Sequence, residues 1–376
     1  MPSAIPPTTS NDDLGIIEKL LQYFQYVDKK WNLSKDITFG DRVTKASFGL
    51  DEKKSLVYIN NGAVAKAQYL LPAMGFASKI YIPPLKGLEN FKGSGNRIGV
   101  IGTGATGVQI IQELGPTARS MVVFPRSPNF ALPMRKKELA TKDVNKHDYL
   151  KLFQVMRDSI SGTNHIAVGR GSMTDTHEQR EALYEQLWAA GGVAPTQANY
   201  GDLMTNIGIN TTFYNFWGDG VRQRITKNDP ELTFYEKKPI MEVKDNGIKM
   251  VDGEFHELDV LILAPGFDPV TGSFSRGSRT TLGMTTSGFP NMFYLYGPQN
   301  PIASASGPVL SEIQSDFIIR TLLHTRKSGK TTIDAKKEGN IPGKARESPF
   351  FMGGLAAYRE ALNICIANEW LSFEHA

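Results

Sequence analysis

The spacing of apolar residues changes several times along the chain, and each change predicts a different kind of element. Apolar residues recur at every third or fourth position over residues 16–31, which predicts an amphipathic helix. Short runs of alternating apolar residues follow, separated by turn signals, and they predict a small antiparallel element. These runs are Ile37–Phe39, Val43–Ser47, Ser55–Ile59 and Tyr69–Pro72.

A strand–loop–helix–strand pattern begins with the apolar run Arg97–Ile101. A G-x-G-x-x-G loop follows, then helical spacing through Leu114, and then the apolar run Ser120–Phe124. In this context the first glycine permits a tight turn, the second lets a pyrophosphate approach the backbone, and the third packs the helix on the strand. The pattern predicts a dinucleotide-binding unit, or a Rossmann unit that no longer binds a ligand. The three glycines are Gly102, Gly104 and Gly107.

Helical spacing dominates from about residue 136 to 226 and predicts a helical insert. Asp175 and Glu178 have the spacing of a capping box, and Gly191 with Gly192 would end that helix. Strand-like runs return afterwards, and a further amphipathic helix is predicted over Ser311–His324. The later predicted strands are Leu232–Tyr235, Ile240–Lys244, Ile248–Val251, Leu258–Ala264 and Asn291–Tyr296.

Composition and charge narrow the class of protein. The 42 Lys and Arg residues against 38 Asp and Glu residues leave a net charge of +4 over 376 residues. This near balance predicts neither nucleic-acid binding nor membrane binding. The N-terminus lacks the pattern of a signal peptide, and no apolar run is long enough to span a bilayer. We therefore expect a cytoplasmic globular protein, most commonly an enzyme.

The sequence offers little support for a metal site or a hydrolase. The six histidines form no cluster with ligand spacing and Cys365 is the single cysteine, so no metal site is predicted. A Gly-x-Ser-x-Gly motif is absent, which leaves a hydrolase triad without a nucleophile. The apolar neighbours of Cys365 predict an inert core thiol. Aromatic residues at 213–217 would either line an apolar pocket or pack in a core.

Five phrases that cover most of the chain resemble one known family. They are FQYVDKKWNLSKDITF, RIGVIGTGATGVQII, VVFPRSPNFALP, LDVLILAPGFDPVTG and TTSGFPNMFYLYGPQNP. In this order they resemble the class B flavoprotein monooxygenases, and the Baeyer–Villiger monooxygenases most closely. The resemblance implies an α/β fold with a Rossmann-like parallel sheet of the FAD/NAD(P)-binding type, a helical insert, and a remnant of a second, FAD-type domain.

The resemblance also implies a division into domains. Residues 1–93 would be the remnant of the FAD-type domain. Residues 94–270 would form an NADP-type Rossmann domain, with the helical insert at about 136–226. Residues 271–376 would return to the FAD-type domain.

Several elements of the family are altered or missing in this sequence. The glycine-rich FAD fingerprint of the family lies upstream of the first matching phrase, and this sequence begins after it. The linker signature of the family keeps Phe91 and Gly93, but Arg97 and Ile101 stand where the family has His and Trp. The family's flavin-side arginine belongs to a segment that is missing after Glu231. We therefore expect flavin binding to be lost.

The NADPH side of the resemblance is better preserved. The three fingerprint glycines are intact, and Arg126 matches the family arginine that contacts the 2′-phosphate of NADPH, where a guanidinium suits a phosphate dianion. The alternative role for Arg126 is an ordinary surface ion pair. These four residues mark an NADP site, which would be vestigial if nothing accepts a hydride.

From this pattern of loss we predict a cofactor-independent cyclase or isomerase of terpenoid or polyketide biosynthesis. An intramolecular Diels–Alder cyclisation in the former flavin cleft is one example. Such a site needs shape, orientation and a hydrogen-bond donor for a hydrophobic small-molecule substrate, and it requires no cofactor. The candidate donors are Tyr214, Trp217, Tyr296, Gln299 and Asn300.

Two alternatives stay open at this point. The first is a Baeyer–Villiger-type monooxygenase that still uses FAD and NADPH. The second is a non-catalytic ligand-binding or scaffold protein, which would bind a ligand without turnover. The pattern favours no particular oligomeric state.

Overall fold

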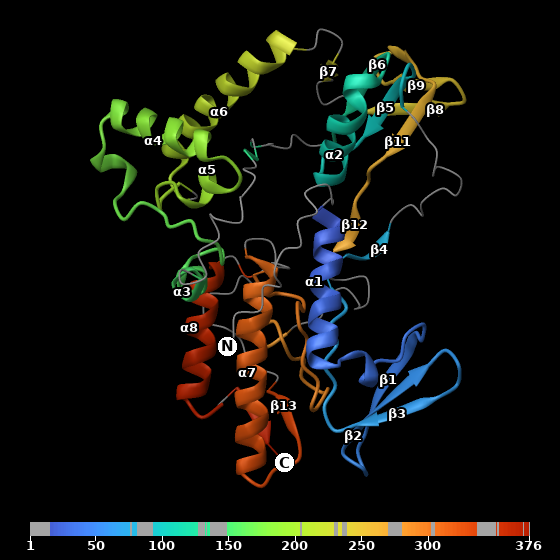
Figure 1. Cartoon of the computed structure of the whole chain (residues 1–376), viewed down its shortest axis with the longest axis vertical. Coiled ribbons are helices and arrows are strands. Elements are labelled where there is room, and N and C mark those ends of the chain that lie inside the picture. Colours follow the sequence, from blue (N-terminus) through green and yellow to red (C-terminus); the bar gives the residue numbers. More distant parts are fainter. Residues whose placement is uncertain are drawn as a thin grey trace. The chain divides into compact units, whose positions relative to one another are not determined.

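The chain folds into two compact units (Figure 1). In the computed structural model the described residues are 16–75, 77–80, 93–126, 132, 134–135, 149–203, 205–228, 232–234, 239–269, 280–301, 305–336, 351, 353–370 and 372–375. The first unit comprises Met1–Ala73, Lys137–Asn164 and Arg279–Ala376. The second unit comprises Met74–Lys136 and His165–Ser278. The assignment of the parts to FAD-type and NADP-type domains stays a prediction.

A four-stranded parallel sheet forms the centre of the second unit. Its order is β11-β5-β6-β7, so the chain starts in the middle, extends to one side, and then adds β11 on the other side of β5. Helix α2 follows β5 directly, as the sequence predicts, and the α/β fold class is confirmed. These elements are β5 (Arg97–Ile101), α2 (Ala105–Leu114), β6 (Ser120–Phe124), β7 (Leu232–Phe234) and β11 (Val260–Leu263).

Apolar packing explains why this sheet forms. The apolar side of α2 packs against four buried residues of β5 and β6, which are Ile98, Val100, Met121 and Val123. A second cluster, which includes Phe124 and Leu258, packs against an antiparallel meander of order β10-β9-β8. The remaining strands of the unit are β4 (Ala77–Ile80), β8 (Ile240–Lys244), β9 (Gly247–Met250), β10 (Phe255–Glu257) and β12 (Phe267–Pro269), and β4 pairs with β12.

Arg97 ties the amino ends of β5 and β11 together. Its side chain donates to the Asp259 carboxylate from Nη2 at 2.6 Å and from Nε at 3.1 Å, and its backbone N–H donates to the same carboxylate at 2.8 Å. Glu257 pairs with the other guanidinium nitrogen. The hydrogen bonds from Arg97 lower the pKa of Asp259 to about 2.

We expect the melting temperature of the second unit to fall when the pH drops below the ordinary Asp pKa of 3.8. Because the pKa of Asp259 is lower in the folded protein, its stabilising effect is present above 3.8 and is lost as the pH falls toward about 2. The pair is partly exposed, so the effect is small. Asp259→Asn should make the melting temperature depend less on pH between about 4 and 2, as measured by thermal unfolding of both proteins. If the melting temperatures of both proteins fall in parallel with pH, the Asp259 carboxylate does not stabilise the unit.

The predicted helical insert is present in the second unit. It contains α4 (His177–Ala190), α5 (Ala194–Gln197) and α6 (Ile207–Asn228). Gly191, at φ +70°, ends α4 as the sequence predicts. The insert has its own small core of buried residues, which are Tyr184, Tyr200, Leu203, Ile209 and Phe213.

The capping box of α4 lies one residue later than predicted. Thr176 is the N-cap residue: its hydroxyl accepts from the Gln179 N–H, and the Gln179 side chain accepts from the Thr176 N–H. Asp175 does not cap the helix because its carboxylate accepts hydrogen bonds from Arg170 at 2.7 Å and from Tyr200 at 2.6 Å. These bonds hold the pKa of Asp175 below its ordinary value.

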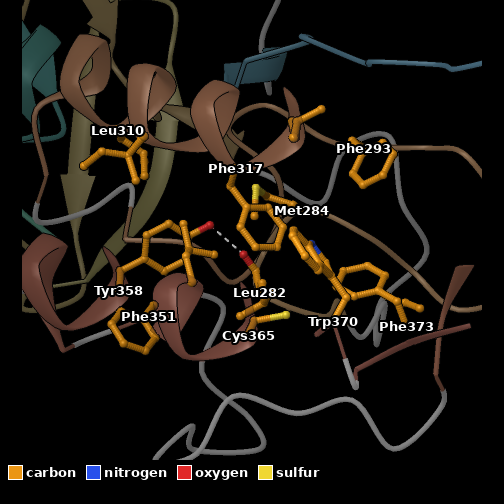
Figure 2. Packing of buried hydrophobic residues seen from close by; sticks show 14 of the residues in the cluster. Leu282, Met284, Phe293, Leu310, Phe317, Phe351, Tyr358, Cys365, Trp370 and Phe373 are labelled. Carbon is orange, nitrogen blue, oxygen red and sulfur yellow. Dashed lines mark hydrogen bonds between the residues drawn. The ribbon is translucent and has the colours of Figure 1, made fainter. Parts of the chain in front are cut away.

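The first unit gathers separate stretches of the chain around one hydrophobic core, part of which Figure 2 shows. Helices α7 and α8 supply much of this core, including Leu310, Phe317 and Tyr358. Arg157 of α3 donates to Glu312 of α7 at 2.8 Å, which fixes this helix of the predicted insert range to the first unit. The elements are α1 (Ile16–Trp31), β1 (Val43–Gly49), β2 (Lys54–Ile59), β3 (Val64–Ala67), α3 (Tyr149–Asp158), α7 (Gly307–Lys327), β13 (Ile333–Ala335), α8 (Gly354–Ala367) and β14 (Phe373–His375).

Three of the predicted strands do not form. Residues 37–39 are exposed, and none of the described strands pairs with them. Residues 69–72 and 291–296 meet at an isolated bridge between Leu70 and Met292. Both ends of the second segment have a φ of +60°, a left-handed conformation that does not continue a strand.

Other properties of the described residues bear on function. None of the described helices combines the length and the apolar character that crossing a membrane requires. Within the same residues, no group of three His, Cys, Asp or Glu side chains is placed to hold a metal ion. Cys365 is buried, as predicted, and burial raises the pKa of its thiol to about 11.

Candidate functional site

Two of the fingerprint glycines are required by the packing of the second unit. Gly102 has a φ of +106°, and a Cβ at this position would collide with the carbonyl oxygen of Ala264, which follows β11. A Cβ at Gly107, inside α2, would collide with the carbonyl oxygen of Gly102. These glycines therefore let the turn, the helix and β11 approach one another, whether or not a ligand binds.

Gly104 is different, because no atom would meet a Cβ there within 4 Å. It is the N-cap residue of α2, and no side chain caps the helix. The first backbone bond of the helix runs from the Val108 N–H to the Gly104 carbonyl at 3.0 Å, so the N–H groups of residues 105–107 have no partner within the helix. A helix N-terminus whose N–H groups have no partner within the helix, preceded by a glycine with room around it, is typical of a phosphate-binding turn.

The sheet places this turn where a nucleotide is expected. β5 lies between β6 and β11, and the chain changes direction across the sheet at this point, which is the switch point where open α/β sheets bind ligands. Arg126 follows the neighbouring strand β6 at the same edge, since Ile101 pairs with Phe124 in register. Among the described residues Arg126 is exposed and forms no ion pair, so the surface ion pair considered from the sequence is not seen.

The first unit holds a strained turn at residues 296–300, which we call the 296–300 turn. Tyr296 has a φ of +60° and Gln299 has a φ of +68°. The Gln299 side-chain oxygen accepts from the Thr280 N–H at 2.9 Å, and the Thr280 hydroxyl donates to the Pro298 carbonyl at 2.8 Å. Non-glycine residues in this conformation persist only where the surroundings fix them, and they concentrate at functional sites.

A line of buried hydrogen bonds connects this turn to helices α7 and α8. The Tyr296 N–H donates to the side-chain oxygen of Gln314 at 3.1 Å, and the Gln314 amide donates to the Tyr358 hydroxyl at 3.1 Å. Tyr358 in turn donates to the Leu282 carbonyl at 2.6 Å, the bond that is dashed in Figure 2. Gln314 and Tyr358 are completely buried. Burial raises the pKa of Tyr358, so its hydroxyl stays a neutral donor.

Asn300 is the last residue of the 296–300 turn, and its side chain has no partner. It has no exposed surface, yet neither its Nδ2 nor its Oδ1 makes a hydrogen bond. Its backbone carbonyl accepts from the Phe351 N–H at 3.1 Å. The turn therefore carries one buried donor and one buried acceptor that the described protein does not use.

The five predicted donors fall into two groups. Tyr296, Gln299 and Asn300 are brought together in the 296–300 turn of the first unit. Tyr214 and Trp217 lie on α6 in the second unit, with ring centroids 5.8 Å apart, and Tyr214 is 45% exposed. The neighbouring Phe213 is instead buried in the core of the insert, where the centroids of its ring and the Tyr184 ring are 5.2 Å apart. The catalytic role of these five residues stays a prediction.

The residues that hold the 296–300 turn in place were not predicted from the sequence. Thr280, Gln314 and Tyr358 fix it, and none of them stands out as a motif. One signal was available: Gln314 lies on the same helical stripe as Leu310 and Phe317, where a polar residue needs a buried partner.

The chain is similar to known monooxygenases in both sequence and structure. No family model matches the chain. The FAD-binding monooxygenase acrE of Aspergillus aculeatus is 33% identical over 435 residues, covering 91% of this chain and 73% of the relative. A solved structure of cyclohexanone monooxygenase with bound ε-caprolactone has a TM-score of 0.84 and 26% identity, covering 96% of this chain and 84% of that one. A cyclohexanone monooxygenase from Rhodococcus sp. Phi1 bound to NADP+ has a TM-score of 0.82 and 26% identity, covering 95% and 84%.

The alignment with the Aspergillus protein contains internal gaps. It spans 435 residues, more than the 376 residues of this chain. Internal segments of the relative therefore have no counterpart in this chain.

The prediction of a cofactor-independent cyclase or isomerase is wrong. The proteins that this chain resembles are monooxygenases, one named as FAD-binding and one solved with NADP+. The prediction that no cofactor is required is wrong for the same reason. Both predictions treated missing segments as lost chemistry.

Proposed function

The chain belongs to the FAD-binding monooxygenases, and on that premise we propose that it is a Baeyer–Villiger-type monooxygenase. Such an enzyme inserts one atom of O2 between the carbonyl carbon of a ketone and a neighbouring carbon. The other atom leaves as water, so that ketone, O2, NADPH and a proton give an ester, NADP+ and water. We propose a hydrophobic ketone as the substrate, in line with the lactone bound in the similar cyclohexanone monooxygenase.

The observation that carries the proposal is the open space at Gly104. The free N–H groups of α2 would hold the pyrophosphate of NADPH there. The packing would tolerate a larger residue at position 104, but its side chain would occupy the space of the pyrophosphate. Arg126, free of ion pairs among the described residues, would hold the 2′-phosphate through paired N–H donors. These roles orient the nucleotide across the carboxyl end of β5.

The described residues show fewer contacts for a flavin than for NADPH. When bound, FAD supplies the electron transfer to O2 that amino-acid side chains do not provide. The printed sequence has one G-x-G-x-x-G loop, and the sheets β1–β3 and β13–β14 of the described first unit are antiparallel, so this part shows no second pyrophosphate site. FAD is therefore added to the purified chain in the test.

The test is a coupled assay of the purified chain with added FAD and NADPH. With cyclohexanone, we expect NADPH oxidation that depends on the ketone, together with ε-caprolactone detected by gas chromatography. A set of larger cyclic and linear ketones extends the search for the preferred substrate. NADPH oxidation that no ketone stimulates, with no ester or lactone formed from any of them, would overturn the proposal.

Arg126→Ala should weaken NADP+ binding by about 10- to 100-fold, which is what a hydrogen-bonded charged contact contributes. NAD+, which lacks the 2′-phosphate, should bind the variant and the unchanged protein equally. Arg119→Ala is the matched control, because Arg119 precedes β6 and lies at the opposite edge of the sheet. Isothermal titration measures all three proteins, and equal losses for both nucleotides would argue against the 2′-phosphate contact.

A further inference from the structure

His375 lies on the inner face of β14, the strand that pairs with β13 in the first unit. In this pairing Phe373 stands opposite Ala335, and His375 stands opposite Ile333. Because alternate residues of a strand share a face, His375 lies on the same face as Phe373, which is buried in the core. Glu374, between them, is exposed on the other face.

Hydrogen bonds to α7 fix which nitrogen of His375 carries the proton. The Thr325 hydroxyl donates to the Thr321 carbonyl at 3.0 Å, so its oxygen is left to accept from His375 Nδ1 at 3.4 Å. A neutral imidazole carries one N–H, so Nε2 is the nitrogen without a proton. Nε2 is buried and has no hydrogen-bond partner among the described residues. A second proton can therefore be taken up only at this covered nitrogen.

The basic groups around His375 oppose a positive charge on its ring. The centroid of the His324 ring, on α7, lies 5.3 Å from that of His375. Lys330, after α7, and Lys336, after β13, also act on His375 through their charges. Burial lowers the pKa of His375 below its ordinary value of 6.5, and these three neighbours lower it further.

The nearby carboxylates do not compensate such a charge. Asp334 and Glu374 stand opposite each other in the β13–β14 pairing, on the face turned away from His375. The Asp334 carboxylate already accepts from the Gly288 N–H at 3.0 Å and from the Ala335 N–H at 2.8 Å. A proton on Nε2 would thus be a buried donor without an acceptor, which is costly.

We propose that His375 is a pH-sensitive latch: its neutral ring holds β14 against α7 and β13, and uptake of a proton at Nε2 releases the strand. Because the pKa of His375 is lower in the docked strand than in a released one, docking is fully stable above 6.5 and weakens as the pH falls below this value. The inference goes beyond the proposed function and does not depend on it.

Release of β14 would also reach the segment that leads to the 296–300 turn. Ile333 of β13 forms two hydrogen bonds with Asn291: its N–H donates to the Asn291 side-chain oxygen at 2.9 Å, and its carbonyl accepts from the Asn291 N–H at 2.8 Å. A β13 strand that has lost its partner β14 holds Asn291 less firmly. The Asn291 amide therefore reports on the latch from outside the two strands.

Hydrogen exchange of the whole chain at about pH 7.5 and about pH 5.5, corrected for intrinsic rates, tests the latch. We expect the amides of β13, β14 and Asn291 to lose protection several-fold at the lower pH. The limit is about tenfold for one proton taken up over the pH unit below 6.5. The amides of β5 and β6 in the second unit should keep their protection.

Three variants separate the latch from a general effect of acid. His375→Asn places an amide nitrogen near the position of Nδ1 but does not titrate, so the pH dependence should disappear. His177→Asn is the matched control, because it makes the same change at an exposed histidine of α4 in the second unit, and it should keep the pH dependence. Lys330→Glu leaves His375 in place and replaces an exposed cation by an anion, so it should make the loss smaller.

Equal protection of β13 and β14 at both pH values in the unchanged protein would overturn the inference. An equal loss in β5 and β6 would indicate general acid unfolding and would also overturn it, as would an undiminished loss in His375→Asn. If His375→Asn leaves β14 unprotected at both pH values, Lys330→Glu decides. A smaller loss in Lys330→Glu supports the latch, and an unchanged loss contradicts it.

Discussion

Gly104→Asp should lower the affinity for NADP+ by about 100-fold, because it places a carboxylate where the pyrophosphate would lie and like charges at close range cost several kcal/mol. The fold should be retained, since a side chain at position 104 meets no atom within 4 Å. An acidic side chain at a helix N-terminus is itself compatible with the helix dipole. The expected result is thus a normal melting temperature together with a large loss of binding.

The matched control for this variant lies at the other end of the same helix. Gly115 follows the last residue of α2, and a side chain there also meets no atom within 4 Å. Gly115→Asp therefore makes the same chemical change in the same element, away from the N-terminus. Calorimetric titration with NADP+ should show normal binding for this variant. Equal affinities for both variants would mean that the turn at Gly104 is not the nucleotide site.

The three fingerprint glycines illustrate what the sequence could and could not decide. Gly102 and Gly107 would be retained by any Rossmann unit of this shape, with or without a ligand, because backbone atoms of Ala264 and Gly102 occupy the space of their side chains. Gly104 has no such packing constraint. The motif alone therefore left the alternative of a ligand-free Rossmann unit open, and the space around the middle glycine favours a unit that binds a nucleotide.

Elements with a strong period were predictable, and locally strained segments were not. The helix over residues 16–31 and the strands β5 and β6 follow directly from apolar spacing. The predicted strand at 291–296 fails because two of its residues adopt a left-handed conformation, which the apolar pattern does not encode. The capping box shifted by one residue because Asp175 bonds to Arg170 and Tyr200, a tertiary effect.

The site was only partly predictable for a similar reason. Tyr296, Gln299 and Asn300 were named because of their place after a strand-like run, and the structure does bring them into one turn. The bonds that fix the turn come from Thr280, 16 to 20 residues earlier in the chain, and from Gln314 and Tyr358 on helices later in the sequence. Such partners follow from three-dimensional packing, and a single sequence does not reveal them.

The function was mispredicted because absences were given more weight than positive geometry. Missing family segments suggested a cleft without a cofactor, although the G-x-G-x-x-G loop was intact in the sequence. A helix N-terminus without a side-chain cap, beside a glycine that the packing does not require, supports the proposed nucleotide site. The absence of other segments does not weaken it, because the second unit forms this turn from its own residues.

Tyr358→Phe is expected to lower the free energy of unfolding by about 2–4 kcal/mol, because it leaves the Leu282 carbonyl and the Gln314 amide buried without partners. The loss should also reach the 296–300 turn, since Gln314 accepts from the Tyr296 N–H. Hydrogen exchange should therefore accelerate at the Tyr296 amide as well as in α8.

Tyr184→Phe is the control for the loss of a buried tyrosine hydroxyl. The Tyr184 side chain is as deeply buried as that of Tyr358, but its hydroxyl has no hydrogen-bond partner. Removing it should leave stability unchanged or slightly raised, because no bond is lost and an unsatisfied polar atom disappears. Chemical unfolding of both variants gives the comparison. If the two substitutions cost the same, the hydroxyl of Tyr358 does not support the turn, and the strained conformation of Tyr296 must be held by packing alone.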